Sequence, residues 1–168
     1  MTLTLDHARK IISASLAKAA EGRFKPLTVA VLDAGGALIA LERQDGTSRM
    51  RPDIAIGKAN GCIAMGVGCR ALLDRAEKQP FFIQAMNSLA GGSLVPVPGG
   101  VLIRNDGAII GAVGITGDTS DNDEIAAIDY ENRDLQRLWS TVLTYAAENA
   151  AAISRAGLIE RLSQQGFD

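Results

Sequence analysis

Residues 95–118 read VPVPGGVLIRNDGAIIGAVGITGD, in which two apolar runs are joined by Asn-Asp-Gly at 105–107. An Asp-Gly pair between apolar runs is typical of a β-hairpin, because the tight turn that matches the strand twist needs positive φ angles. The run 108–116 is apolar at successive positions, which predicts a central strand covered on both faces. Pro96 and Pro98 lack the N–H that a sheet ladder requires, so we expect them where a strand begins. The loop after this strand opens a helix, and such loops commonly carry functional residues.

The rest of the chain adds strands and helices to this hairpin. Five strands are expected in all, at 27–33, 37–42, 93–97, 100–104 and 108–116. Most of their connections are too short for parallel crossovers, so the sheet should be largely antiparallel. Helices are expected at 5–21, 53–78, 81–89 and from Asp121 onward. We expect these helices to cover both faces of the sheet.

Composition and charge narrow the class of protein. A chain of 168 residues with 47% hydrophobic residues and 18 glycines fits one dense α/β or α+β domain. The formal net charge of −2 gives no electrostatic reason to bind nucleic acid or an anionic membrane. No secretory signal is visible, and no apolar run reaches the about 20 residues that span a bilayer. We therefore expect a cytoplasmic protein without a nucleic-acid or membrane partner.

Cys62 and Cys69 both lie in the long helix predicted for 53–78. Two turns of a continuous helix would separate them by about 10.5 Å along the axis, which is too far for a disulfide. Their spacing is not that of a C-x-x-C motif either, which argues against a zinc or redox site. The sequence therefore predicts that both are buried small hydrophobic residues.

Four acidic residues follow the last strand, at Asp118, Asp121, Asp123 and Glu124. Acidic side chains at a helix N-terminus can cap it and complement its dipole, which contributes about 0.3–1 kcal/mol each. Four of them beside a strand end exceed what a cap needs. They also suit a hard cation, an iron ligand set or an acid–base pair. Both interpretations stay open.

A second cluster, Arg49, Arg51, Asp53 and Lys58, surrounds the start of the long predicted helix. Asp53 suits the helix N-terminus, whereas Arg51 and Lys58 can bind carboxylates. A solvated loop is the alternative interpretation, above all for Arg49. The Pro98-Gly99-Gly100 turn can line a pocket with backbone N–H groups, or it can be a simple connection between strands.

His7 is the single histidine, which excludes a metal site built from several histidines of one chain. A Ser-His-Asp triad would need His7, which lies on the predicted first helix without a nucleophile elbow nearby. His7 is therefore considered as a lone metal ligand, with a solvated or capping role as the alternative.

Several blocks occur in a distinctive order, namely VLDAGG at 31–36, DIAIGKA at 53–59, PGG at 98–100 and GAVGITG with a following Asp-Glu at 111–124. This ordered set resembles the GlcG/HbpS family over about residues 2–128. The resemblance implies an α+β fold, a profilin-like three-layer α/β/α sandwich around a five-stranded antiparallel sheet, which agrees with the strands predicted above. It also implies homo-oligomers, often octamers, and haem as a ligand, with haem degradation or redox sensing in some relatives.

The C-terminal part departs from this pattern. Chains of the family usually end soon after the helix that the Asp-Glu pair begins, whereas this one continues to Asp168. We therefore predict a single domain over 1–168 with an atypical helical extension or insertion at about 129–168. Such a segment can cover the pocket or change the oligomer.

Three functions are carried forward. The first is a small-ligand-binding protein, with haem as the expected ligand, His7 as the metal ligand, and a pocket lined by Asp53, Pro98, Gly99, Gly100, Thr116 and Gly117. The second is an enzyme acting on a small organic acid, with Asp123 and Glu124 as acid–base groups and Arg51 and Lys58 as a carboxylate clamp. The third is a non-catalytic accessory subunit of a catabolic system.

Overall fold

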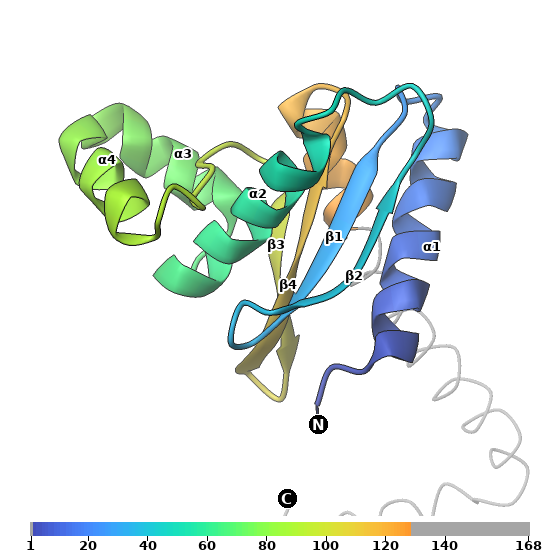
Figure 1. Ribbon diagram of the computed structural model, residues 1–168, viewed down its shortest axis with the longest axis horizontal. Coiled ribbons are helices and arrows are strands. Elements are labelled where there is room, and N and C mark those ends of the chain that lie inside the picture. The colour runs from blue at the N-terminus through green and yellow to red at the C-terminus, as the bar shows by residue number, and fades with distance from the viewer. Residues whose placement is uncertain (1, 129–168) are drawn as a thin grey trace, which may run out of the picture. The chain divides into compact units, whose positions relative to one another are not determined.

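The computed structural model describes residues 2–128 (Figure 1). Its elements are α1 (Leu5–Glu21), β1 (Thr28–Asp33), β2 (Leu38–Arg43), α2 (Arg51–Met65), α3 (Cys69–Lys78), α4 (Pro80–Leu89), β3 (Gly100–Asn105) and β4 (Ala108–Thr116). A further helix, called here the Ser120 helix, begins at Ser120 and continues through the last described residue. The extension predicted at 129–168 lies outside the described residues.

The strands form one antiparallel sheet in the order β2-β1-β4-β3. The predicted Asn-Asp-Gly hairpin joins β3 and β4 and is confirmed. Asp106 and Gly107 have φ angles of 49° and 80°, the positive values that a tight turn between twisted strands requires. β4 lies between β1 and β3, and its residues 111–116 are buried. The prediction of a central strand covered on both faces is therefore correct.

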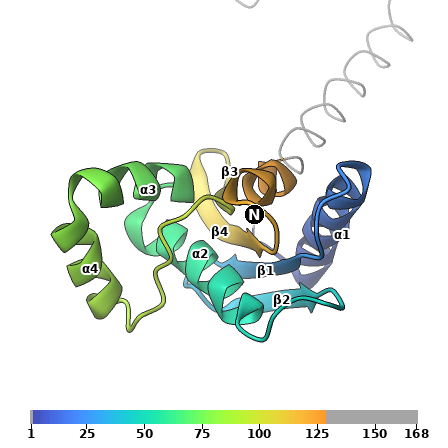
Figure 2. The ribbon, with the colours of Figure 1, turned by 90° about the horizontal axis from the view of Figure 1, so that it is seen from above.

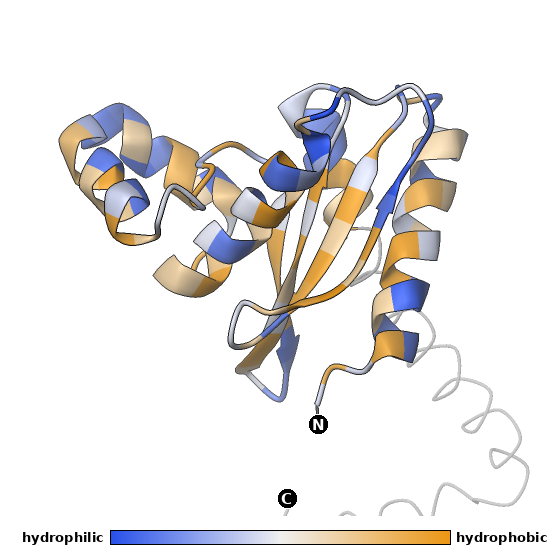
Figure 3. Cartoon of the chain, viewed as in Figure 1, coloured by the Kyte–Doolittle hydropathy of each residue, from blue (hydrophilic) through white to orange (hydrophobic). Residues whose placement is uncertain are grey.

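Each face of the sheet carries its own apolar core, and the helices cover the two faces (Figures 1 and 2). On the α1 side, Val29 and Val31 pack with apolar residues of α1 and of the Ser120 helix. On the α2 side, Leu32 and Ala112 pack with apolar residues of α2 and α3. The two inner strands, β1 and β4, are hydrophobic along most of their length (Figure 3). The α+β class and the antiparallel sheet are thus as predicted.

The sheet of the described residues has four strands and not the predicted five. Residues 93–97 run along α2 instead of pairing with β3: the Val95 N–H donates to Gly57 O at 3.1 Å, and Asn60 Nδ2 donates to Ser93 O at 2.8 Å. The prolines at 96 and 98 cannot donate to a ladder. A Cβ on Gly57 would lie 2.7 Å from Val95 Cγ2, so this glycine lets the segment approach the helix.

The long helix predicted for 53–78 is two helices. Gly66 adopts the left-handed conformation, φ 68°, and ends α2, and Gly68 is the extended N-cap residue of α3. A left-handed glycine stops a helix because it satisfies the last carbonyls without a Cβ clash. The chain turns back here, and the sulfur atoms of Cys62 and Cys69 lie 3.4 Å apart. Both cysteines are buried as predicted, but their expected separation was wrong.

Within residues 2–128, no helix is both long enough and apolar enough to cross a bilayer.

Candidate ligand-binding site

Most of the predicted site residues gather at the end of the sheet where β1 begins and β4 ends. Thr28 and Thr116 are register partners there, so their side chains share a face of the sheet. That face is the one beneath α2, because Gly114, two residues before Thr116, lies against Ala55 of α2 so closely that a Cβ would strike the Ala55 carbonyl. The start of α2 therefore lies over Thr116, and Arg51 Nη1 donates to Thr116 Oγ1 at 2.6 Å.

Lys58 and Asp123 form a buried ion pair beside this contact. Lys58 Nζ donates to Asp123 Oδ2 and to Ile115 O, both at 2.8 Å, and only 2% of each side chain is exposed. The other carboxylate oxygen accepts the Asp118 N–H at 3.1 Å. Burial raises the pKa of Asp123 above its usual value, and the positive charge of Lys58 opposes that shift. The pair joins α2 to the end of β4 and to the Ser120 helix.

The Pro98-Gly99-Gly100 turn is built against the same pair. Gly99 has a φ of 115°, and a Cβ there would lie 2.8 Å from Lys58 Nζ. Its carbonyl accepts the Ile115 N–H at 2.7 Å. Gly117 has a similar constraint on the other side of β4, where a Cβ would strike the Pro26 carbonyl. These glycines let three chain segments meet at one end of the sheet.

The other acidic residues each have a protein partner. Asp118 accepts the Lys25 N–H and the Thr119 N–H, both at 2.7 Å, and these backbone bonds lower the pKa of its carboxyl. Asp121 and Glu124 both accept from the guanidinium of Arg70 on α3. The four acids therefore divide among Lys58, Arg70 and backbone N–H groups, a pattern that suits a helix start anchored to its surroundings.

His7 and Asp53 lie outside this arrangement. His7 belongs to the capping box of α1: its N–H donates to Thr4 Oγ1 at 3.2 Å, and its Nδ1 accepts the Thr4 N–H at 3.4 Å. α1 ends at Glu21, and Lys25, which follows it, contacts Asp118 at the site. About 14 residues of helix, roughly 21 Å, separate His7 from this end of α1. Asp53 is exposed in the first turn of α2, where its charge complements the helix dipole.

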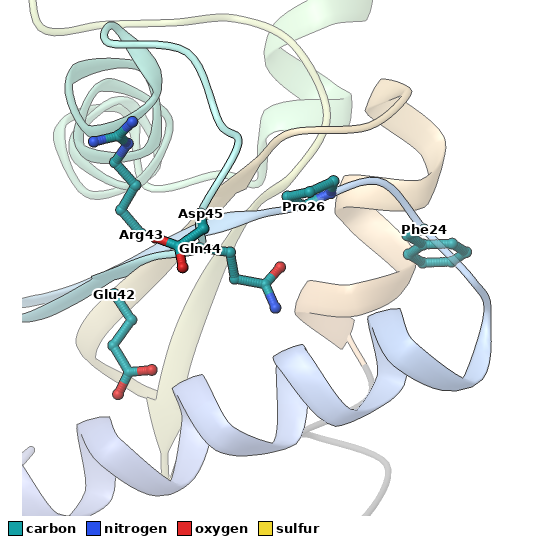
Figure 4. A pocket seen from close by; sticks show the side chains of 6 residues that line it. All are labelled: Phe24, Pro26, Glu42, Arg43, Gln44 and Asp45. Atoms are coloured by element: carbon teal, nitrogen blue, oxygen red, sulfur yellow. The ribbon is translucent and has the colours of Figure 1, made fainter.

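A cavity of about 550 Å³ opens at the same end of the sheet and is lined by Phe24, Pro26, Glu42, Arg43, Gln44 and Asp45 (Figure 4). Its volume lies in the range of about 300–1,000 Å³ that small-molecule pockets occupy. Gln44 Oε1 accepts the Leu27 N–H at 2.7 Å, which fixes one wall. None of the predicted site residues lines this cavity.

Comparison with known proteins now identifies the family. The model of a family described as haem degrading protein HbpS-like matches residues 3–130. The chain belongs to this family.

Individual relatives agree with the assignment. An uncharacterized 15.0 kDa protein in the dhaT-dhaS intergenic region of Citrobacter freundii is 30% identical over 128 residues, covering 75% of this chain and 87% of that protein. A crystal structure of a PduOC–haem complex superposes with a TM-score of 0.68 at 25% identity, covering 76% of this chain and 91% of that one. A double mutant of HbpS from Streptomyces reticuli gives a TM-score of 0.66 at 25% identity, covering 77% and 84%. The antiparallel α+β fold is thus that of HbpS and its relatives.

For an HbpS-like protein the question is which residues of this chain suit haem. Haem iron is held by His, Cys, Met or Tyr in most haem proteins, and none of these lines the cavity. Residues 2–128 also hold no group of three or more His, Cys, Asp or Glu side chains placed to bind a metal ion. The cavity does offer the Phe24 ring and Pro26, which suit the macrocycle. However, the two carboxylates of Glu42 and Asp45 outnumber the one cation of Arg43, whose side chain points away from Phe24 and Pro26 (Figure 4). The fit therefore extends to the ligand's plane, and not to its charge or to an axial ligand.

Sequence reasoning missed Arg70, Arg43 and Thr28. Arg70 could not be placed because the sequence predicts one continuous helix over 53–78, where the structure has α2 and α3. Arg43 and Thr28 are register partners, so Arg43, Thr28 and Thr116 form a row across three strands. Thr28 Oγ1 is buried without a hydrogen-bond partner, which is costly unless water or a ligand supplies one. Its signal in the sequence was a polar residue at the start of an apolar run.

Proposed function

We propose that this chain binds haem at the end of the sheet where β1 begins and β4 ends. The observation that carries the proposal is the likeness to PduOC, whose crystal structure is a haem complex, over 91% of that chain at 25% identity. Membership of the HbpS-like family supports the same ligand class. The cavity at this end of the sheet has a suitable volume.

Two arginines at this end of the sheet supply positive charge, which the cavity lining as a whole lacks. Arg51 donates one N–H of its guanidinium to Thr116 Oγ1, and a guanidinium has five N–H donors in all. It therefore keeps donors for a second partner at the rim of the site. Arg43 lines the cavity and also donates to Thr47. Arginine pairs with carboxylates in a bidentate manner, so both residues suit the two propionates of haem.

The bound group would supply redox or oxygen chemistry through its iron. The residues of this chain bind and orient it, and no catalytic step is assigned to them. The acid–base pair considered for an organic-acid enzyme is disfavoured, because Asp123 is buried and already bound to Lys58. A substrate carboxylate would have to displace Asp123 to reach Lys58. Arg51 is the member of that predicted clamp which remains available.

Assembly into a homo-oligomer is proposed as well. The side chains of Phe81 and Leu89 on α4 are 85% and 80% exposed, and large exposed apolar residues often lie in contacts between chains. Light scattering with size-exclusion chromatography tests this, and a monomer at micromolar concentration would contradict it.

Titration of the purified full-length chain with haemin, followed by the Soret band, tests the ligand. We expect a saturable change at a fixed ratio of haem to chain. Arg51→Ala should weaken haemin binding about tenfold or more, since a charge-assisted hydrogen bond contributes about 1.5–3 kcal/mol. Arg104→Ala is the matched control, because Arg104 lies at the opposite end of the sheet and donates to Gly107 O. A Soret change that never saturates would refute haem binding, and equal effects of the two variants would refute the placement.

A further inference from the structure

The two buried cysteines are the strongest feature that the proposed function leaves unused. Cys62 lies near the end of α2, and Cys69 is the first residue of α3. Their sulfur atoms are 3.4 Å apart, and both side chains are fully buried. The sequence contains no other cysteine, so no third thiol competes for either one.

The surrounding chain permits the sulfur atoms to move closer. A disulfide bond needs an S–S distance of about 2.05 Å, so the two atoms must approach by roughly 1.4 Å. The connection between the helices contains Gly66 and Gly68, and a Cβ on Gly66 would meet nothing within 4 Å. A short glycine-containing connection can absorb such a shift without moving either helix far.

We propose that Cys62 and Cys69 are a redox site and form a reversible intramolecular disulfide when the protein meets hydrogen peroxide. In the first step the Cys69 thiolate attacks a peroxide oxygen, giving a sulfenic acid and, with one proton, water. In the second step the sulfur of Cys62 attacks the Cys69 sulfur. The S–S bond forms, the S–O bond breaks, and the departing hydroxide takes the Cys62 proton to become a second water. One peroxide is reduced, and two thiols are oxidised.

The environment distinguishes the two sulfurs. The hydrogen bond with Cys62 lowers the pKa of Cys69. Burial opposes this shift, and the charge of Lys58 and the Gly100 N–H support it. The pKa of Cys62 is raised by its hydrogen bond with Cys69 and by burial. Cys69 also begins a helix, where the dipole favours a thiolate. Cys69 is therefore the attacking thiol and Cys62 the resolving one.

The pair lies directly against the candidate site. A Cβ on Gly100 would strike the Cys69 sulfur and lie 2.8 Å from that of Cys62. Gly99, the preceding residue, is the one packed on Lys58 Nζ. The redox site thus adjoins the turn that holds the buried ion pair, although its chemistry does not depend on haem binding.

The test uses the reduced full-length chain without haem. It is treated with hydrogen peroxide, quenched, denatured, alkylated with N-ethylmaleimide and weighed by mass spectrometry. We expect both alkylatable thiols to disappear together, the chain to remain a single chain on a non-reducing gel, and dithiothreitol to restore both thiols. A sample denatured before the peroxide step shows how much disulfide forms when the fold does not hold the two thiols together. Two surviving thiols in the folded protein, or disulfides only between chains, would overturn the proposal.

Single variants test the roles of the two thiols. Cys62→Ala retains the attacking thiol without its partner, so peroxide should leave a sulfenic acid on Cys69 that dimedone traps. Cys69→Ala should react at least tenfold more slowly. Far-UV circular dichroism verifies that both variants fold, and the wild-type thiol count remains decisive if one does not. Faster reaction of Cys69→Ala would overturn the assignment of the attacking thiol.

Discussion

Replacing Lys58 with methionine is expected to destabilise the protein strongly. The Lys58→Met change keeps the length of the side chain but removes the cation that binds Asp123 Oδ2 and Ile115 O, both at 2.8 Å. Asp123 would then be a buried carboxylate with only the Asp118 N–H as a partner. Breaking a buried ion pair by removing one member costs about 3–5 kcal/mol. With a urea m-value of about 2 kcal/mol per molar, the unfolding midpoint should fall by roughly 2 M at pH 7.

The pH dependence gives this prediction a second test. A carboxyl whose pKa is raised in the folded state binds its proton more tightly there than in the unfolded chain, where the value is about 3.9. It therefore favours folding at low pH, and this contribution is lost as the pH rises through the raised pKa. Without Lys58 the pKa of Asp123 should rise further, because the opposing positive charge is gone. The stability difference between Lys58→Met and the wild type should consequently shrink between pH 7 and pH 5.

Two controls isolate the buried charge. The double variant Lys58→Met/Asp123→Leu removes both charges and should recover much of the lost stability. Arg70→Met breaks the exposed pairs with Asp121 and Glu124, and its urea midpoint should change far less. A Lys58→Met loss below about 1 kcal/mol, or one independent of pH, would refute the view that this pair is a desolvated, structurally essential contact.

Two further changes test the geometry of the site. Gly114→Ala places a methyl group against the Ala55 carbonyl, and this overpacking should lower the free energy of unfolding by about 1–3 kcal/mol in urea denaturation; an unchanged midpoint would contradict the close approach of α2 to β4. His7→Ala should leave the haemin titration unchanged, because the Nδ1 lone pair already accepts the Thr4 N–H and the ring lies far from the site. Loss of the Soret change in this variant would instead identify His7 as the iron ligand.

Local signals predicted much of the fold. The Asn-Asp-Gly turn, the apolar run of β4 and the first helix at 5–21 are determined by residues next to one another in sequence. The acidic residues after Thr116 correctly marked the start of another helix. The ordered blocks also indicated the family, which the comparison over residues 3–130 confirmed.

The errors arose where a local pattern had two outcomes. A helix with Gly66 and Gly68 can continue or stop, and only the packing of α3 on the α2 side of the sheet made it stop. Residues 93–97 have an apolar pattern that suits a strand. They run along α2 because Gly57 admits Val95, while two prolines reduce what a sheet would gain from this segment.

Which residue types meet at the candidate site follows from local sequence, because β4 and the loop after it are contiguous in the chain. Their partners depend on how distant segments pack in the fold. Lys58 meets Asp123 across 65 positions, Arg70 meets Glu124 across 54, and Cys62 comes within 3.4 Å of Cys69. A carboxylate, a guanidinium and a thiol each have many acceptable partners in sequence. Tertiary packing brings only a few of these partners within reach of each group.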